Sequence, residues 1–315
     1  MGVQGSLRRT VAGCGVLVLA GAALGCNGAT VEKTVPTTMG SAEAKVLAGF
    51  VSPESSLPVG DRWFVSNMGG PDPQAKDGNG FISELKSDGS VVNSKVVPRP
   101  GDPPLNAPKG MATIDHTVFV ADIDRVVGFD LDTFAQVFEA TVEGDTPTLL
   151  NDIVVRDPGT LLVTDTARGE VHTLDLANRK FETLADGMPG ANGIAIDGSG
   201  GIAYVAALGA QHQGGDLWAV ELGPAPVVIR KVGTVHGILD GVQILRDGNL
   251  VVSDWVSADD SAGVITVYKP DGTEVQRIPV PAGLRGPADI QLAPGDKALW
   301  VASIPDDQVF VLAVP

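Results

Sequence analysis

The strongest constraint on this 315-residue chain is an internal repeat of about 47 residues. Each of six segments has a small or polar pair, a short apolar alternation, a turn, and a second apolar run. The second position of the pair is occupied in turn by Glu54, Lys109, Asn151, Asn192, Asp240 and Ala288. The spacings are 55, 42, 41, 48 and 48 residues. Repetition in this range with an all-β pattern is typical of a β-propeller, so we expect six blades.

Turn signals divide each repeat into short strands. Asp247-Gly248 and Pro294-Gly295 separate paired apolar runs, as expected for hairpins. Further apolar runs at 80–85, 126–131 and 264–268 indicate third strands, and 135–140 indicates a fourth. The high content of Gly (40) and Pro (22) also favours many short elements over long helices.

The ends of the repeat region indicate how the propeller closes. The sixth repeat stops after its third strand, at 309–314, and leaves no fourth strand. Residues 45–50 resemble the segments that precede the later repeats. We therefore predict an all-β, six-bladed propeller over 45–315, with the last blade closed by the N-terminal strand, which removes an open sheet edge.

The first 44 residues are predicted to direct export and not to form part of the folded domain. Arg8 and Arg9 precede an uncharged apolar run at 11–24, too short to span a bilayer but suited to a signal-peptide core. The run ends at Ala23-Leu24-Gly25-Cys26, which resembles a bacterial lipobox with Ala23 where Leu is usual. We predict a signal peptide (1–25), lipidation of Cys26 and a flexible tether (26–44), with an ordinary secretory signal as the alternative. The protein would then be lipid-anchored in the bacterial cell envelope, touching the membrane through the anchor alone.

Composition excludes several functions. The net charge of −16 argues against a nucleic-acid partner. The only cysteines are Cys14 and Cys26, so the repeat region has neither a disulfide framework nor a cysteine zinc site. No Gly-x-Ser-x-Gly motif occurs, which makes serine or cysteine nucleophile chemistry unexpected.

The six second positions define the candidate site. In a propeller the start of each innermost strand faces one mouth of the central channel, so these residues should form a ring there. Four are oxygen donors: Glu54, Asn151, Asn192 and Asp240. Two carboxylates and two amides suit a hard cation such as Ca²⁺. Taken one at a time, Asn192-Gly193 and Asp240-Gly241 are equally compatible with turns, and Asn151 with an Asx turn.

These residues carry a resemblance to the family of gluconolactonase, regucalcin (senescence marker protein) and luciferin-regenerating enzyme. It covers nearly the whole chain from about residue 45. The matching segments are Pro53-Glu54, Asn151-Asp152-Ile153, Asn192-Gly193 and Asp240-Gly241. The resemblance implies a six-bladed propeller with one divalent ion, held by Glu54, Asn192 and Asp240. It further implies that Asn151 contacts the ion, its water or the substrate, and that Asp240 serves in acid/base catalysis.

The activity implied is metal-assisted hydrolysis of a lactone, in which the ion polarises the carbonyl. Ca²⁺ is the expected cofactor, with Zn²⁺ or Mn²⁺ as alternatives because mixed carboxylate and amide sites accept several ions. We expect a monomer acting on a small lactone or ester.

One departure leaves the function open. Sugar-lactonase members carry an Arg shortly before the Asn-Asp segment, whereas residues 146–150 contain none. Two alternatives therefore stand beside the lactonase. One is a non-catalytic propeller that binds a ligand or protein. The other is a propeller enzyme of the strictosidine-synthase or paraoxonase type, with an apolar substrate.

Several residues near the ring have weaker signals. Lys109 and His236 are candidates for contacting substrate at the rim, although a solvated lysine and a loop histidine are the simpler interpretations. The loop at 67–80 is either a lid or an ordinary hairpin loop. Asp122, Asp165 and Asp254, which recur at the ends of second strands, are expected to be structural hydrogen-bond acceptors. Finally, the four tryptophans are expected in the core: Trp63, Trp218, Trp255 and Trp300.

Overall fold

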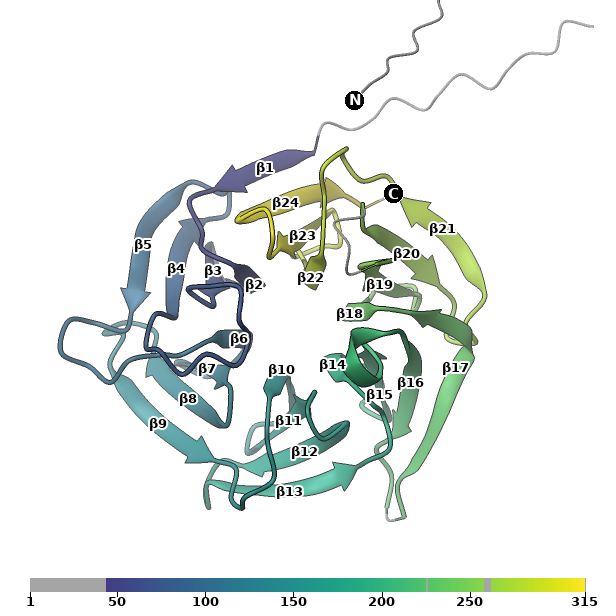
Figure 1. The fold of residues 1–315 in the computed structure, drawn as a ribbon, viewed down its shortest axis with the longest axis horizontal. Coiled ribbons are helices and arrows are strands. Elements are labelled where there is room, and N and C mark those ends of the chain that lie inside the picture. The colour runs from purple at the N-terminus through teal and green to yellow at the C-terminus, as the bar shows by residue number, and fades with distance from the viewer. Residues whose placement is uncertain (1–43, 225, 258–261, 315) are drawn as a thin grey trace, which may run out of the picture. The chain divides into compact units, whose positions relative to one another are not determined.

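The computed structural model of the chain describes residues 44–224, 226–257 and 262–314. The predicted signal peptide, the lipidation site at Cys26 and all but the last residue of the predicted tether lie outside these ranges. The described strands form six four-stranded antiparallel sheets, which surround a common centre (Figure 1). This arrangement confirms the predicted six-bladed propeller.

The first three blades each take four consecutive strands, numbered outward from the centre. Blade 1 contains β2 (Pro53–Val59), β3 (Arg62–Asn67), β4 (Phe81–Lys86) and β5 (Val91–Val97). Blade 2 contains β6 (Pro108–Ile114), β7 (Thr117–Asp122), β8 (Arg125–Asp130) and β9 (Gln136–Thr141). Blade 3 contains β10 (Leu150–Asp157), β11 (Thr160–Asp165), β12 (Glu170–Asp175) and β13 (Lys180–Ala185).

Blades 4 and 5 follow the same order, and blade 6 is built from both ends of the propeller. Blade 4 contains β14 (Ala191–Ile196), β15 (Ile202–Ala207), β16 (Gly215–Glu221) and β17 (Val228–Gly237), with the 3₁₀ turn η1 (Ala210–His212) between β15 and β16. Blade 5 contains β18 (Leu239–Ile244), β19 (Leu250–Asp254), β20 (Val264–Tyr268) and β21 (Glu274–Ile278). Blade 6 contains β22 (Pro287–Leu292), β23 (Ala298–Ser303), β24 (Gln308–Ala313) and β1 (Lys45–Ala48).

The closure of blade 6 agrees with the prediction from sequence. Strand β1 pairs antiparallel with β24, in the register Lys45↔Val311 to Ala48↔Gln308. Leu47 is buried in a cluster with Trp63 of blade 1 and Trp300 of blade 6. The indole rings of these two tryptophans stack with centroids 3.9 Å apart. The N-terminal strand is therefore held by backbone pairing and by an apolar contact at the junction of two blades.

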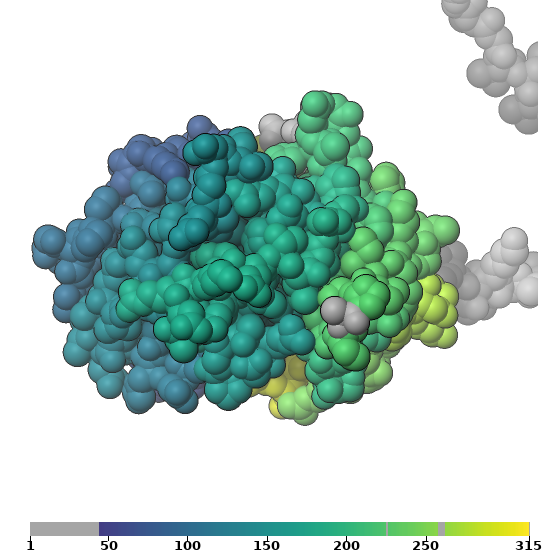
Figure 2. Space-filling view, turned by 90° about the horizontal axis from the view of Figure 1, so that it is seen from below, coloured from purple at the N-terminus to yellow at the C-terminus, as the bar shows by residue number. Residues whose placement is uncertain are grey.

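The hydrophobic core lies between neighbouring sheets. The apolar clusters cross blade boundaries, as where Phe64 and Ile82 of blade 1 pack with Val120 and Phe129 of blade 2. Successive blades pack against one another on the side of the propeller seen in Figure 2. No helix in the described part of the chain is long and apolar enough to cross a membrane.

Every innermost strand contains a β-bulge near its start. In blade 1, Pro53 pairs with Asn67 and Ser56 with Val65, so Glu54 and Ser55 together oppose the single residue Ser66. The same shift occurs in the other five innermost strands. A bulge adds one residue and bends the strand. The predicted ring residue is the first member of the bulged pair in all six blades.

Candidate functional site

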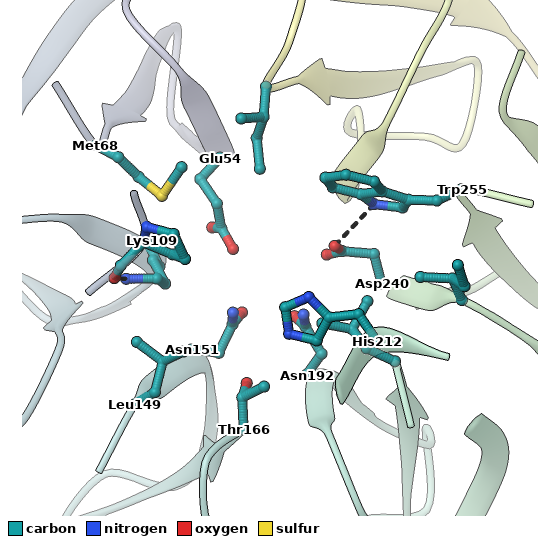
Figure 3. A pocket seen from close by; sticks show the side chains of 14 residues that line it. Glu54, Met68, Lys109, Leu149, Asn151, Thr166, Asn192, His212, Asp240 and Trp255 are labelled. Atoms are coloured by element: carbon teal, nitrogen blue, oxygen red, sulfur yellow. Dashed lines mark hydrogen bonds between the residues drawn. The ribbon is translucent and has the colours of Figure 1, made fainter. Parts of the chain in front are cut away.

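The four oxygen donors of the ring meet at one pocket. Glu54, Asn151, Asn192 and Asp240 all line a cavity of about 100 Å³ (Figure 3). All four side chains are buried. Each comes from the innermost strand of a different blade, so only the closed propeller brings them together.

Each of these four side chains has an oxygen without a hydrogen-bond partner among the described residues. The atoms are Oε2 of Glu54, Oδ1 of Asn151, Oδ1 of Asn192 and Oδ1 of Asp240. A buried polar atom without a partner is costly, and such atoms in a native fold call for a ligand, water or ion. Four of them facing one small cavity match the oxygen ligands preferred by hard divalent cations.

The structure excludes the interpretation of Asn192-Gly193 and Asp240-Gly241 as turns, because both pairs lie within innermost strands. At Gly193 and Gly241 there is no room for a side chain. A Cβ on Gly193 would lie 2.4 Å from the backbone oxygen of Asp240, and one on Gly241 would lie 2.6 Å from the nitrogen of Ile290. Neighbouring strands therefore approach closely just beneath the ring, which draws its side chains together.

Residues on the second strands hold the ring in place. Thr164 on β11 accepts a hydrogen bond from the backbone of Asp152 (2.9 Å) and donates one to the backbone oxygen of Asn192 (2.5 Å). Ser253 on β19 links Gly241 to Ala288 in the same way. A hydroxyl on one blade thus fixes the ring position of the next blade.

The recurring acids at the ends of second strands are structural, as expected from the sequence. Asp165 Oδ1 accepts a hydrogen bond from the backbone N–H of Leu149 (3.0 Å). Asp254 Oδ1 accepts one from Ile238 (3.0 Å), and Asp122 Oδ1 accepts one from Ala107 (2.9 Å). Each bond anchors the residue two positions before a ring residue and so sets where the ring begins.

A second layer of carboxylates lies next to the ring. Asp152 accepts hydrogen bonds from the backbone of Ile153 (2.7 Å) and Ile194 (2.8 Å). Asp289 accepts one from Ile290 (2.7 Å) and another from the hydroxyl of Ser55. Burial raises the pKa of Asp289 to about 6 and that of Asp152 well above its usual range. Because their oxygens already have partners, these carboxylates serve the structure of the channel.

The ring carboxylates are destabilised in their charged form. Burial raises the pKa of Asp240 to about 8, and the nearby charge of Asp289 acts in the same direction. Burial likewise raises the pKa of Glu54 well above its usual range, with further contributions from Asp240 and Asp289. A divalent cation would relieve this repulsion.

Lys109, predicted at the rim, is a buried member of the pocket wall. Its Nζ donates hydrogen bonds to the backbone oxygens of Pro73 (2.9 Å) and Ala107 (2.8 Å). Burial lowers its pKa to about 8, although the charge of Glu54 acts in the opposite direction. Lys109 is therefore not a solvated lysine, which was the simpler interpretation of the sequence.

The histidine that reaches the pocket differs from the one predicted. His236 lies on β17 with its side chain 59% exposed, bonded to Asp216 (3.1 Å), and does not line the pocket. His212 of η1 lines it instead and points toward the ring (Figure 3). Two residues of this turn, Gln211 and His212, have positive φ values of 56° and 57°. Nothing in the sequence repeat signals this position, because within the described ranges such a turn is found in blade 4 alone.

Seven apolar side chains form the wall above the ring, and we call them the apolar wall: Met68, Pro73, Leu149, Leu208, Ile238, Trp255 and Ile304. Four of them directly follow the second strand of their blade, a recurring position that the sequence repeat did not reveal. Trp255 was predicted in the core, but it lines the pocket, whereas Trp63 and Trp300 are buried as predicted.

The loop at 67–80 reaches the pocket through Met68 and Pro73. It is attached to blade 2 by the bond from Lys109 to Pro73 and by an ion pair between Lys76 and Asp124 (2.6 Å). The loop is thus more than a solvated hairpin connection, because it contributes to one side of the pocket.

The donor set fits a single cation bound by mixed ligands. Within the described residues no group of three or more His, Cys, Asp or Glu side chains is placed to hold a metal ion. The ring instead offers two carboxylates and two amides, all with an unpartnered oxygen. Glu54, Asn151, Asn192 and Asp240 could therefore hold one oxygen-loving divalent ion.

Comparison with known proteins gives one family and several similar folds. The model of the SMP-30/Gluconolactonase/LRE-like region matches residues 88–304. A search of the curated proteins found no match. Among solved structures, a gluconolactonase from Xanthomonas campestris is 15% identical, with a TM-score of 0.63 over 87% of this chain and 91% of that one.

Two further structures are similar to the same extent. A luciferin-regenerating enzyme is 14% identical, with a TM-score of 0.62 over 86% of this chain and 96% of that one. A calcium-binding protein, regucalcin, from Agrobacterium tumefaciens is 17% identical, with a TM-score of 0.63 over 84% of this chain and 90% of that one. At these identities the structural likeness establishes the fold.

Proposed function

The chain belongs to the SMP-30/gluconolactonase/LRE-like family, and from this premise we propose that it is a divalent-metal-assisted lactonase. The observation that carries the proposal is the set of four buried, unpartnered oxygens around one pocket. A purely structural channel would have those oxygens paired, as they are in the neighbouring Asp152 and Asp289.

Glu54, Asn151, Asn192 and Asp240 would hold the ion, and Ca²⁺ is the ion we propose. The calcium-binding regucalcin among the structural relatives supports this choice. When bound, the ion would polarise the lactone carbonyl and offset the negative charge of the ring. Zn²⁺ and Mn²⁺ are the alternatives that the same ligands allow.

We assign the proton transfers to Asp240. The Trp255 N–H holds Oδ2 of this carboxylate at the pocket wall (3.0 Å), which fixes its orientation. The carboxylate takes a proton from the water whose oxygen forms the new bond to the carbonyl carbon. The bond from that carbon to the oxygen atom within the lactone ring then breaks, and the proton passes to this departing oxygen. The product is the open hydroxy acid, with water added across the ester bond.

The direct test is a set of lactones and aryl esters, assayed with Ca²⁺ and with excess chelator. We expect hydrolysis that requires the ion and falls by about 10²-fold or more in Asp240→Ala. Asp132→Ala is the matched control, because Asp132 lies on the surface with its side chain 72% exposed. Activity that survives both the chelator and Asp240→Ala would refute the mechanism. Binding of calcium without any hydrolysis would instead favour the non-catalytic propeller.

We further propose that the protein is exported and lipid-anchored through Cys26, as the motif at residues 23–26 indicates. The tether that follows would hold the propeller away from the membrane. The active pocket would then meet small molecules of the cell envelope.

A further inference from the structure

The apolar wall limits what kind of lactone the pocket can accept. It supplies half of the residues around the cavity, and it covers the space above the four ring oxygens. Leu149 and Leu208 are buried, and the indole of Trp255 forms another side. A substrate whose lactone ring contacts this wall must have an apolar surface on that side.

The remaining polar groups of the pocket are almost fully engaged. Lys109 Nζ donates to two backbone oxygens, and the Thr166 hydroxyl donates to the backbone oxygen of Ala191 (2.8 Å). Among the described residues, His212 is the one polar side chain outside the four ring residues that has no hydrogen bond in the pocket, and the amide nitrogens of Asn151 and Asn192 are the other donors without a partner. A polyhydroxylated ring would therefore lose water from several hydroxyls and find few partners in exchange.

A groove continues from the pocket between blades 3 and 4. This groove has a volume of about 360 Å³ and shares Leu149, Thr166 and His212 with the pocket. Its lining includes Gly169, Gly187, Gly190 and Gly209, together with the exposed residues Gln74, Pro189, Ala210 and Gln211. The smaller pocket can hold little more than one ring, so a longer substrate must extend into the groove.

The groove offers no unpaired charge. Arg168 is its charged residue, and the guanidinium bonds to the backbone oxygens of Thr146 (2.7 Å) and Pro147 (3.2 Å) and pairs with Asp165. A charged substituent would find no free counter-ion there. An uncharged chain could lie on the glycine backbone and against the exposed Pro189 and Ala210.

We propose that the substrate is a small lactone ring with an uncharged alkyl chain. The ring would sit above the four oxygens and the chain would leave through the groove between blades 3 and 4. This inference rests on the proposed lactonase function and adds the substrate class and the route of the substituent.

The test compares three lactones with the calcium-loaded wild-type protein: γ-decanolactone, γ-butyrolactone and glucono-δ-lactone. We expect kcat/KM for γ-decanolactone to exceed that for glucono-δ-lactone by about 100-fold and that for γ-butyrolactone by about tenfold. Hydrolysis of glucono-δ-lactone at an equal or higher kcat/KM would overturn the substrate class while leaving the lactonase function intact.

A binding experiment separates failure of the subsite from failure of the activity. The lactam corresponding to γ-decanolactone resists hydrolysis, and its binding can be followed by calorimetry. If no lactone is hydrolysed but this lactam binds more tightly than gluconolactam, the proposed function fails and the apolar subsite stands. If the alkyl lactam binds no more tightly than gluconolactam, the apolar subsite is refuted as well.

Ala210→Phe tests the route of the chain, because this side chain is exposed at the groove, where a larger group can be added without entering the core. We expect kcat/KM for γ-decanolactone to fall about tenfold further than that for γ-butyrolactone. Ala177→Phe is the matched control, at an exposed turn outside the groove, and should leave both values unchanged. An equal effect of Ala210→Phe on both lactones would refute the groove as the exit.

Discussion

The indole N–H of Trp255 donates a 3.0 Å hydrogen bond to Oδ2 of Asp240, while Oδ1 of the same carboxylate has no partner among the described residues. Trp255 directly follows β19, and Asp240 is the bulged residue at the start of β18, so the two come from neighbouring strands of blade 5. The bond leaves one oxygen of Asp240 available to an ion in the pocket.

Replacing this tryptophan should weaken ion binding. Trp255→Phe removes the hydrogen bond but keeps an aromatic wall, and the loss of a bond worth about 1 kcal/mol should raise the calcium Kd about fivefold. Calcium-dependent tryptophan fluorescence should also diminish. Trp218→Phe is the control, because Trp218 lies outside the pocket and its Nε1 has no partner among the described residues. Unchanged Kd values by calorimetry in both variants would show that Trp255 does not position Asp240.

The stability of the metal-free protein should fall as the pH rises from about 4 to about 8. The pKa of Asp240 is raised to about 8 and that of Asp289 to about 6, whereas unfolded aspartates titrate near about 4. In this window the folded state binds more protons than the unfolded state, so the free energy of unfolding decreases with pH. Lys109, with its pKa lowered to about 8, acts in the opposite direction only above that pH.

Calorimetry of chelator-treated protein at pH 5 and pH 8 measures this effect. We expect a lower Tm at pH 8, and a larger rise in Tm on adding Ca²⁺ at pH 8 than at pH 5, because the ion competes with protons for the ring. Asp240→Asn should flatten the pH dependence. A Tm of the metal-free protein that increases from pH 5 to pH 8 would contradict the arrangement of buried carboxylates described above.

The glycines beneath the ring should not accept a side chain. Gly241→Ala places a Cβ 2.6 Å from the backbone nitrogen of Ile290, and such overpacking costs about 1–3 kcal/mol. Gly198→Ala is the control, since a Cβ there meets nothing within 4 Å. Denaturant unfolding compares the two. Equal stability of both variants would mean that the innermost strands are farther apart than the structure places them.

The N-terminal strand should contribute measurably to stability. Leu47 is 7% exposed at the junction of blades 1 and 6, so Leu47→Ala should cost about 2–4 kcal/mol. Its neighbour Val46 is 47% exposed, and Val46→Ala should change the free energy of unfolding by less than about 0.5 kcal/mol. If the two substitutions have the same small effect, β1 does not close the propeller in solution.

Lipidation can be tested independently of the fold. In a bacterial host, we expect the wild-type protein to incorporate a labelled fatty acid and to fractionate with membranes. Cys26→Ser should abolish both properties, because the serine hydroxyl cannot form the thioether to the lipid. Cys14→Ser is the matched control within the leader. A soluble, unlabelled wild-type protein would favour the ordinary secretory signal.

The sequence determined the architecture and the composition of the ring. Six repeats and one missing strand were sufficient for the six-bladed fold and its closure, because a propeller repeats the same local hairpins and needs every edge paired. The second position of each repeat identified the four oxygen donors, since equivalent positions of a symmetric ring lie at the same height.

Only the tertiary structure decided what surrounds that ring. Each donor stands at a bulge, and neighbouring blades approach closely at the adjacent glycines, a contact between blades that no single repeat encodes. His212 enters the pocket on the 3₁₀ turn of blade 4, while His236 pairs with Asp216 outside it. In the sequence, Trp255 and Leu208 look like ordinary apolar residues. In the fold both line the pocket, because the ends of the second strands converge at the channel mouth.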